Sequence, residues 1–194
     1  MTDAQLTDTA LIARLLDGDP SAGQLLYDRL IRIVDWTLHR LLGRSQADHD
    51  DLVQSAFEQI VTTLYKDTFA RSCSLTSWAS AVTTRIALTE LRTQQRRRKN
   101  FGARVELEEQ SLSSPIANIE AQTAARLELE RIRRVLPLVH PDNAQVLILH
   151  ELNDLSLSEI ASTLGLSASA VQTRLWRGRK ELLERLASED RELQ

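Results

Sequence analysis

The sequence contains few of the residues that cross-link a chain or interrupt a helix. Its 194 residues include one cysteine (Cys73), six glycines and four prolines. A lone cysteine excludes a disulfide within the chain and argues against a cysteine-based zinc site. The four histidines show no short ligand spacing, and we find no phosphate-binding glycine loop and no nucleophile elbow. We therefore expect neither an enzyme nor a protein that carries a cofactor.

Long apolar runs are also missing. No segment approaches the roughly 18 apolar residues of a membrane span, and no secretion signal opens the sequence. We therefore expect a cytoplasmic protein. Hydrophobic residues make up 42% of the chain and charged residues 26%, with few stretches of period-two alternation. This composition predicts an all-α fold, and the length suffices for one medium domain or two small ones.

The most informative stretch, residues 154–186, has the pattern of two helices joined by a tight corner. Ser156 and Glu159 have the spacing of a capping box, which predicts a helix start directly after Ser156. Gly165 can end this helix in the left-handed conformation, and Ser167 can cap the next one. This is a helix-turn-helix pattern, whose second helix has an apolar side and a side of donors and cations suited to a DNA major groove. An ordinary pair of helices with a solvated face would show the same pattern. Evidence from the rest of the chain is therefore needed to distinguish DNA binding from a structural role.

Charge is distributed unevenly along the chain. The formal net charge is -3, yet residues 1–67 hold 6 Lys/Arg against 11 Asp/Glu, whereas residues 85–99 hold six cations against one acid. This acidic front and basic middle suggest partners of opposite sign. A predicted helix near residues 50–64 has an outward-facing acidic strip, defined as Asp50, Asp51, Gln54 and Glu58. From spacing alone, the preferred interpretation of the acidic strip is a solvated helix face.

The middle of the chain predicts a loop, a long helix and a linker. Residues 66–74 form the loop, and the helix over 75–98 ends in the run QQRRRK. Phe69, Trp78 and the neighbouring hydroxyls and cations could hold unpaired bases, although packing is the preferred role of Trp78, and the cationic end could contact phosphates. Glycine, serine, proline and acidic residues then break the periodicity, which predicts a linker over 99–117.

The linker divides the chain into a front domain, residues 1–98, and a back domain, residues 118–194. In the front domain we expect Asp19 to cap a helix that runs to about Leu42, and in the back domain we expect Asp142 to cap another.

Three segments, taken together, resemble one protein family. DHDDLVQSAFEQI resembles the acidic helix of region 2 in bacterial RNA polymerase sigma factors of the sigma-70 superfamily, and FARSCSLTSWASAVTTRIALTELRTQQRRR resembles its continuation. HPDNAQVLILHELNDLSLSEIASTLGLSASAVQTRLWRGRKELLERL resembles region 4. The short linker, with no third domain, is similar to the layout of the extracytoplasmic-function (ECF) group. The resemblance implies a subunit that binds core RNA polymerase, directs it to specific promoters and promotes DNA opening.

The resemblance also implies roles for individual residues. The acidic strip would dock the clamp helices of the polymerase β′ subunit, and the β flap would be a second contact. Residues that would recognise and melt the minus-ten element are Phe69, Arg71, Ser72, Ser74, Trp78, Arg85, Thr89, Arg92, Arg96 and Arg97. Residues that would meet the minus-thirty-five element are Ser169, Gln172, Thr173, Arg174, Trp176, Arg177 and Lys180. The acidic linker would thread towards the polymerase cleft, and an anti-sigma factor would be the regulatory partner.

The chain departs from the family pattern at four of these positions. Family members commonly have Gly in place of Arg71, Asn in place of Arg85, Asp in place of Thr89, and Lys or Arg in place of Gln172. These changes leave the class intact but prevent a prediction of the promoter sequence. Two alternatives stay open at this point. One is a helix-turn-helix regulator that binds an operator without polymerase, and the other is an interaction protein that sequesters a partner.

Overall fold

The computed structural model describes residues 6–43, 48–101 and 119–192, and within these ranges it contains helices and no strands. The helices are α1 (Asp8–Leu16), α2 (Ala22–Leu42), α3 (His49–Tyr65), α4 (Leu75–Phe101), α5 (Ile119–Val135), the short 3-10 helix η2 (Leu136–Leu138), α6 (Pro141–Glu151), α7 (Leu157–Leu164) and α8 (Ala168–Glu192). The predicted all-α fold is confirmed. Most of the predicted linker, residues 102–117, lies outside the described residues. None of the described helices is long and apolar enough to cross a membrane.

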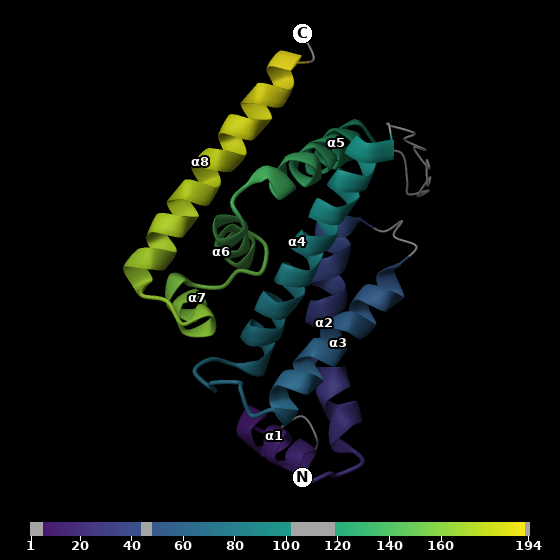
Figure 1. The fold of residues 1–194 in the computed structure, drawn as a ribbon, viewed down its shortest axis with the longest axis vertical. Helices are drawn as coiled ribbons and strands as arrows, with labels where there is room; N and C mark the ends of the chain where they lie inside the picture. The colour runs from purple at the N-terminus through teal and green to yellow at the C-terminus, as the bar shows by residue number, and fades with distance from the viewer. Residues whose placement is uncertain (1–5, 44–47, 102–118, 193–194) are drawn as a thin grey trace.

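Helix α4 lies at the centre of the molecule (Figure 1). Helices α2 and α3 pack on one side of it, while α6, α7 and η2 pack on the other. We call α1–α4 the front bundle and α5–α8 with η2 the back bundle. Residues Ala79, Thr83, Thr84 and Ala87 of α4 are completely buried. Because these side chains are small, helices can approach α4 closely from both sides.

An apolar row on α2 forms the middle of the front bundle. Leu26, Leu30, Val34 and Leu38 recur every four residues and are at most 1% exposed. They belong to one core with Ile60 and Leu64 of α3 and Leu75 and Leu88 of α4. Full burial of such a side chain contributes about 1.5–3 kcal/mol relative to exposure. This core holds α3 so that the acidic strip faces solvent.

Asp19 does not cap α2 in the way that the sequence predicts. The helix begins at Ala22, and Asp19 instead organises the turn before it. Its Oδ1 accepts hydrogen bonds from Ser21 N at 2.9 Å and Ser21 Oγ at 2.8 Å, and its Oδ2 accepts one from Arg14 Nε at 2.7 Å. The hydrogen bonds from Ser21 stabilise the carboxylate most, and that from Arg14 adds to them. Together they lower the pKa of Asp19 from its ordinary value of 3.8 to about 2.

The lowered pKa of Asp19 predicts a pH-dependent contribution to stability. The contribution is fully present above the pKa of the unfolded chain and is lost as the pH falls towards the folded-state pKa of about 2. We expect the difference in unfolding free energy between the protein and its Asp19→Asn variant to be constant above about pH 5 and to shrink between about pH 4 and pH 2. Urea unfolding at several pH values in this range measures the difference in unfolding free energy, and Asp17→Asn is the control variant. A constant difference down to pH 2 would contradict the prediction.

Helices α7 and α8 form the predicted helix-turn-helix. Ser156 Oγ accepts from Glu159 N at 3.3 Å and Glu159 Oε2 accepts from Ser156 N at 2.8 Å, which is a complete capping box. The Ser156 hydroxyl also donates to Glu159 Oε2 at 2.6 Å, and this hydrogen bond together with that from Ser156 N lowers the pKa of Glu159. Gly165 ends α7 in the left-handed conformation, with φ 64°, and Ser167 Oγ accepts from Ala170 N at 3.2 Å. The sequence therefore encodes this motif locally, before any long-range packing.

The prediction for Asp142 is wrong in detail. His140 occupies the N-cap of α6 and Pro141 its first position, so that Asp142 lies in the first turn. A carboxylate in the first turn still interacts favourably with the positive end of the helix. Pro141, which fixes φ and lacks an N–H, is well suited to the first helical position, so the helix begins one residue before Asp142.

The two bundles pack on one another through an apolar interface. Leu136, Val139, Ala144 and Ile148 of the back bundle belong to the core of the front bundle, and Ala81 of α4 belongs to the core of the back bundle. Hydrogen bonds from side chains to backbone carbonyls also cross between the bundles: Gln145 Nε2 to Ala81 O (3.1 Å), Arg92 Nη2 to Val139 O (3.4 Å), Arg133 Nη2 to Arg40 O (3.0 Å) and Ser72 Oγ to Ser162 O (2.8 Å). The structure is thus a closed arrangement of the two halves.

Candidate functional site

The acidic strip lies on the exposed face of α3. Asp50, Asp51, Gln54 and Glu58 are all exposed, and Gln54 Nε2 donates to Glu58 Oε1 at 2.9 Å. Asp50 and Asp51 lie in the first turn of the helix, where negative charge is favourable. Among the described residues, no cation forms an ion pair with any member of the strip. The strip can therefore bind a basic partner without first breaking an ion pair within the described residues.

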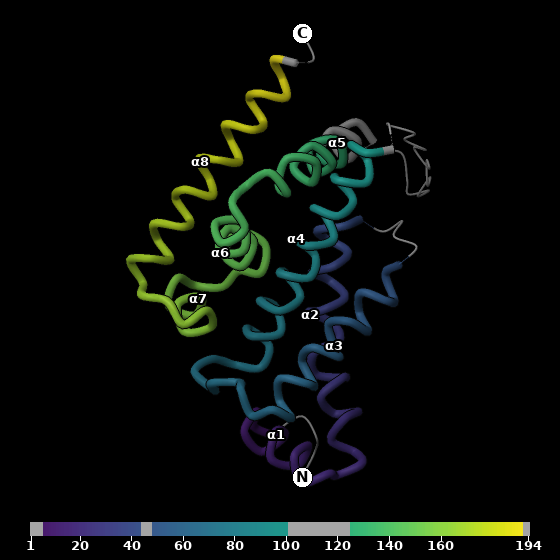
Figure 2. The backbone as a smooth tube through the Cα atoms, in the orientation of Figure 1, coloured from purple at the N-terminus to yellow at the C-terminus, as the bar shows by residue number. Residues whose placement is uncertain are grey.

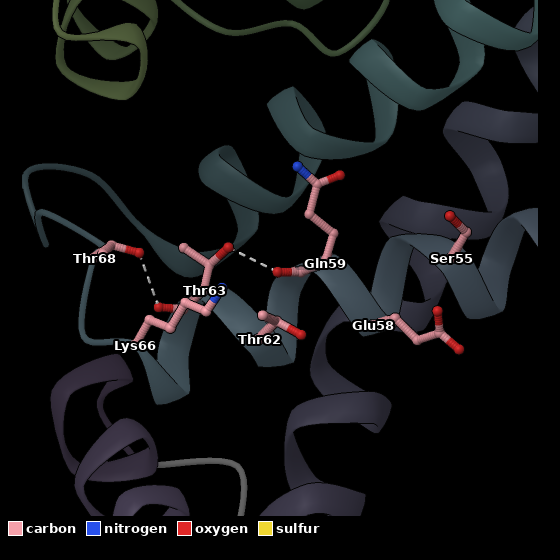
Figure 3. Close-up of a pocket in the computed structure, with 7 residues that line it drawn as sticks. All are labelled: Ser55, Glu58, Gln59, Thr62, Thr63, Lys66 and Thr68. Atoms are coloured by element: carbon pink, nitrogen blue, oxygen red, sulfur yellow. Dashed lines mark hydrogen bonds between the residues drawn. The ribbon is translucent and has the colours of Figure 1, made fainter.

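A polar hollow extends the acidic strip along α3 (Figure 3). It is lined by Ser55, Glu58, Gln59, Thr62, Thr63, Lys66 and Thr68. Two of its hydroxyls are already used locally, because Thr63 Oγ1 donates to Gln59 O at 2.7 Å and Thr68 Oγ1 donates to Thr63 O at 3.2 Å. Glu58 is common to the hollow and the strip. The outer surface of α3 thus presents a continuous polar face rather than a closed ligand cavity.

The loop before α4 is held by packing of its aromatic ring. Phe69 is only 7% exposed, and its ring centroid lies 4.8 Å from that of half-buried Trp78. Phe69 therefore supports the loop in this arrangement and is not presented to solvent, contrary to a role as an exposed base-stacking ring. Trp78 has the packing role that its sequence context favours.

The polar residues of this loop are also engaged. Arg71 has φ 56° and pairs with Asp67 at 2.6 Å. Ser74 Oγ accepts from Ser77 N at 3.0 Å, so Ser74 caps the start of α4. Ser72 donates to Ser162 O of α7. Arg71 therefore stands in the left-handed region, which glycine adopts more readily than any other residue.

The proposed DNA-facing residues of α4 divide into two groups. Arg85, Thr89, Arg96 and Arg97 are exposed, and the Thr89 hydroxyl donates back to Arg85 O at 2.8 Å. Arg92 is half-buried against Val139, and burial, reinforced by neighbouring Arg96, lowers the pKa of its guanidinium. Burial of an arginine that makes only carbonyl hydrogen bonds is costly. Arg92 is therefore the member of the set that would gain most from an anionic partner.

The second helix of the helix-turn-helix presents a polar outer face. Helix α8 runs along the edge of the molecule from its corner with α7 (Figure 2). Gln172, Thr173, Trp176, Arg177 and Lys180 are exposed, Trp176 by 61%, and Lys180 Nζ lies 5.4 Å from the centroid of the Trp176 ring. Within the described part of the chain, the side chains of Gln172 and Arg177 have no hydrogen-bond or ion-pair partner. We call these five residues the reading face.

Two residues that the resemblance assigns to the minus-thirty-five element, Arg174 and Ser169, lie outside the reading face. Arg174 is half-buried and pairs with Asp142 of α6 at 3.1 Å. It points towards the supporting helix, so it braces α8 rather than facing outwards. Ser169 is exposed in the first turn of α8, with its hydroxyl 3.1 Å from Ser167 Oγ. It lies where a helix N-terminus can meet a phosphate.

Sequence reasoning missed the contacts that fix α8 against α6. Gly178 is buried in the middle of α8, and a Cβ at this position would lie 2.8 Å from Asn143 O. Three residues further on, Glu181 accepts hydrogen bonds from His140 N at 2.8 Å and from Asn143 Nδ2 at 2.7 Å. The glycine within an otherwise strongly helical stretch was the available signal, because it weakens a helix unless close packing requires it.

Comparison with known proteins identifies both halves. The model of Sigma-70 region 2 matches residues 26–97, and that of Sigma-70, region 4 matches residues 129–182. RNA polymerase sigma factor NccH of Alcaligenes xylosoxydans xylosoxydans is 33% identical over 192 residues, 97% of this chain and 98% of that protein. The chain belongs to the sigma-70 family and to its ECF group. This sigma factor therefore contains both region 2 and region 4.

Further relatives agree with this assignment. The ECF RNA polymerase sigma-E factor of Haemophilus influenzae is 28% identical over 93% of this chain and 95% of its own length. The solved structure of CnrH in complex with the cytosolic domain of CnrY is 25% identical, with a TM-score of 0.56, and covers 93% of this chain and 97% of CnrH. RpoE in complex with the anti-sigma factor NepR, from Bartonella quintana, shares the fold at 18% identity and a TM-score of 0.50, over 86% of this chain and 98% of RpoE.

Proposed function

We propose that this sigma factor docks core RNA polymerase through the acidic strip and selects promoters through the reading face of α8. One observation carries the proposal: both surfaces are exposed on a single chain of sigma-70 type, with their charged side chains largely free of internal partners. The acidic strip would meet the clamp helices of the β′ subunit, and the back bundle would meet the β flap. The operator-binding alternative leaves the acidic strip without a role.

The closed arrangement of the two bundles has to open on a promoter. The minus-ten and minus-thirty-five elements are about 25 base pairs apart, which is roughly 85 Å of duplex at about 3.4 Å per base pair. In the closed arrangement Ser72, in the loop assigned to the minus-ten element, bonds Ser162 of the helix-turn-helix at 2.8 Å. The 25 residues of α8 span only about 37 Å. Both elements can be engaged together only when the bundles separate.

Opening also supplies the DNA contacts that the closed arrangement hides. Separation releases Ser72, in the loop before α4, from α7, and it releases Arg92 of α4 from Val139. Arg92 then exchanges a carbonyl acceptor for a phosphate, a stronger charge-assisted partner. A protein that holds the bundles together would keep the sigma factor inactive, which is the role we propose for an anti-sigma partner.

Reconstituted transcription tests the proposal. The purified chain is mixed with bacterial core polymerase and a library of promoter fragments, and the transcripts are sequenced. We expect starts downstream of a shared two-element motif. Specific DNA binding without polymerase, together with no transcript from any fragment, would favour the operator-binding alternative and overturn the proposal.

Replacing Arg177 by alanine should weaken promoter selection. Arg177 is exposed on the reading face, and loss of a side chain that contacts a base costs about 1–3 kcal/mol and relaxes specificity at that position. The measurement is the yield of transcripts from promoters that vary in the minus-thirty-five element. Arg185→Ala, at an exposed arginine further along α8, is the matched control. Equal loss for both variants on all promoters would contradict a role in sequence readout.

A further inference from the structure

A cluster of two histidines and one aspartate lies where α2 ends and α3 begins. Asp35 and His39 are one turn apart on α2, and His49 is the first residue of α3. Asp35 Oδ1 lies 3.2 Å from His39 Nδ1 and 2.9 Å from His49 Nε2, and the two imidazole rings have centroids 4.0 Å apart. The potential ligand atoms of the three side chains all lie within 4.8 Å of one another. The nine residues between the two histidines hid this grouping in the sequence.

The donor set matches a divalent transition metal. Two imidazole nitrogens and one carboxylate oxygen form a ligand set typical of zinc, with the fourth position left to water. Ligand atoms bound at about 2.0–2.2 Å in a tetrahedral site lie roughly 3.3 Å apart. The two distances from Asp35 Oδ1 are already close to this value. The two histidine nitrogens lie within 4.8 Å of each other, and an approach of up to roughly 1.5 Å would complete the geometry.

The three side chains face one another through a single carboxylate oxygen, Asp35 Oδ1. His39 Nδ1 also lies 3.1 Å from the backbone carbonyl of Asp35. His49 Nδ1 is buried on the inner side of the cluster and faces away from the other two ligands, so Nε2 is the ring nitrogen of His49 that an ion can reach. The His49 side chain is 15% exposed, that of His39 35% and that of Asp35 48%, so the cluster has a buried inner side and an outer side that is open to ions.

We propose that this cluster binds a zinc-class divalent cation that links α2 to α3. His39 binds through Nδ1, His49 through Nε2 and Asp35 through Oδ1, and each imidazole carries its proton on the other ring nitrogen. The acids of the first turn of α3, Asp50 and Asp51, add negative charge nearby. So does the C-terminal end of α2, whose partial negative charge favours a cation.

The site lies beside two functional surfaces. It holds the first residue of α3, so a bound ion fixes the turn from which the acidic strip begins. On the other side, Arg133 of the back bundle donates to His39 O at 3.4 Å and to Arg40 O at 3.0 Å. Metal binding is independent of the proposed promoter function, and it can be measured without polymerase or DNA.

Calorimetric titration of the full chain with zinc, after treatment with a chelator, tests the site. We expect one saturable ion per chain and a rise in the unfolding midpoint with added zinc, because an ion that binds only the folded chain stabilises it. Cobalt bound in the same place should give the visible absorption bands of a four-coordinate ion. Loss of a direct ligand should weaken binding by on the order of 100-fold or more, the upper limit seen for outer-shell partners.

Matched variants decide the outcome. His39→Gln and His49→Gln should each weaken zinc binding, whereas His140→Gln, at an exposed histidine outside the cluster, should leave it unchanged. Circular dichroism without metal establishes that each variant is folded, and Asp35→Asn provides a third variant if one histidine variant is not. Absence of saturable binding, or equal binding by the cluster variants and His140→Gln, would overturn the proposal.

Discussion

Replacing Asp50 and Glu58 by lysine is expected to remove the affinity of the sigma factor for core polymerase while leaving the chain folded. Both side chains are exposed on α3 and neither has a cationic partner among the described residues. Reversal turns two attractive contacts with a basic docking surface into two repulsive ones. We expect a loss of about 100-fold or more in affinity, which corresponds to about 2.7 kcal/mol or more. Titration of labelled core polymerase measures this loss, and transcription should fall with it.

The control for this experiment carries the same change in charge elsewhere on the front bundle. Asp17→Lys with Asp28→Lys alters two exposed acids that lie outside α3. Docking through the acidic strip predicts normal core binding for this control, whereas attraction by net charge alone predicts equal losses for both double variants. Thermal unfolding separates a docking defect from a folding defect, because a lysine in the first turn of α3 costs only about 0.3–1 kcal/mol. Unchanged core binding in the strip variant would contradict the proposed docking surface.

Substitution of Gly178 is expected to give the largest loss of stability in the back bundle. An added Cβ would lie 2.8 Å from Asn143 O and 3.4 Å from Leu147 Cβ, so that α8 has to move away from the backbone of α6. Overpacking of this kind costs about 1–3 kcal/mol, and the higher helix propensity of alanine returns about 1 kcal/mol. We expect Gly178→Ala to destabilise the back bundle by up to about 2 kcal/mol, and Gly178→Val to destabilise it further because valine is larger and returns less helix propensity.

Gly23 provides the matched control. It is also within a helix, but a Cβ added there would meet nothing within 4 Å. Gly23→Ala should therefore be neutral or stabilise the protein by up to about 1 kcal/mol. Urea unfolding measures the change in unfolding free energy for the Gly178 and Gly23 variants. Promoter binding should also fall in the Gly178 variants, because displacement of α8 strains the hydrogen bonds of Glu181 to His140 and Asn143. Equal stability changes at the two glycines would contradict the packing argument.

The sequence predicted those features that depend on local chemistry. The capping box of Ser156 and Glu159, the left-handed Gly165 and the exposed acidic strip all follow from spacing within one or two helical turns. The roles of the strip and of the loop came from the family resemblance, because a solvated face and a docking face have the same periodicity. Family membership is confirmed, while the roles of individual residues stay predictions.

The features that the sequence did not predict depend on contacts between distant segments. Arg133 lies in a helix rich in Glu/Arg pairs and looks like an ordinary solvated cation, yet it reaches the carbonyls at the end of α2 and burial lowers its pKa. Phe69 is a loop residue that turns inwards against Trp78. The Asp35–His39–His49 cluster unites two helices across a connection. None of these has a local pattern, since each depends on how the helices meet.

Most of the hydrogen bonds between the bundles constrain the sequence only at the donor, although Asn153 Nδ2 donates to a side-chain acceptor, Thr37 Oγ1, at 3.0 Å. Gln145, Arg92, Arg133 and Ser72 all donate to main-chain oxygens, which every amino acid possesses. The acceptor positions, Ala81, Val139, Arg40 and Ser162, can therefore mutate without loss of these bonds, provided that the helices keep their places. Each donor can in turn be lost singly, which would loosen the contact in small steps. The balance between closed and open forms can thus be tuned across related proteins by changes at a few donor positions, without redesign of either bundle.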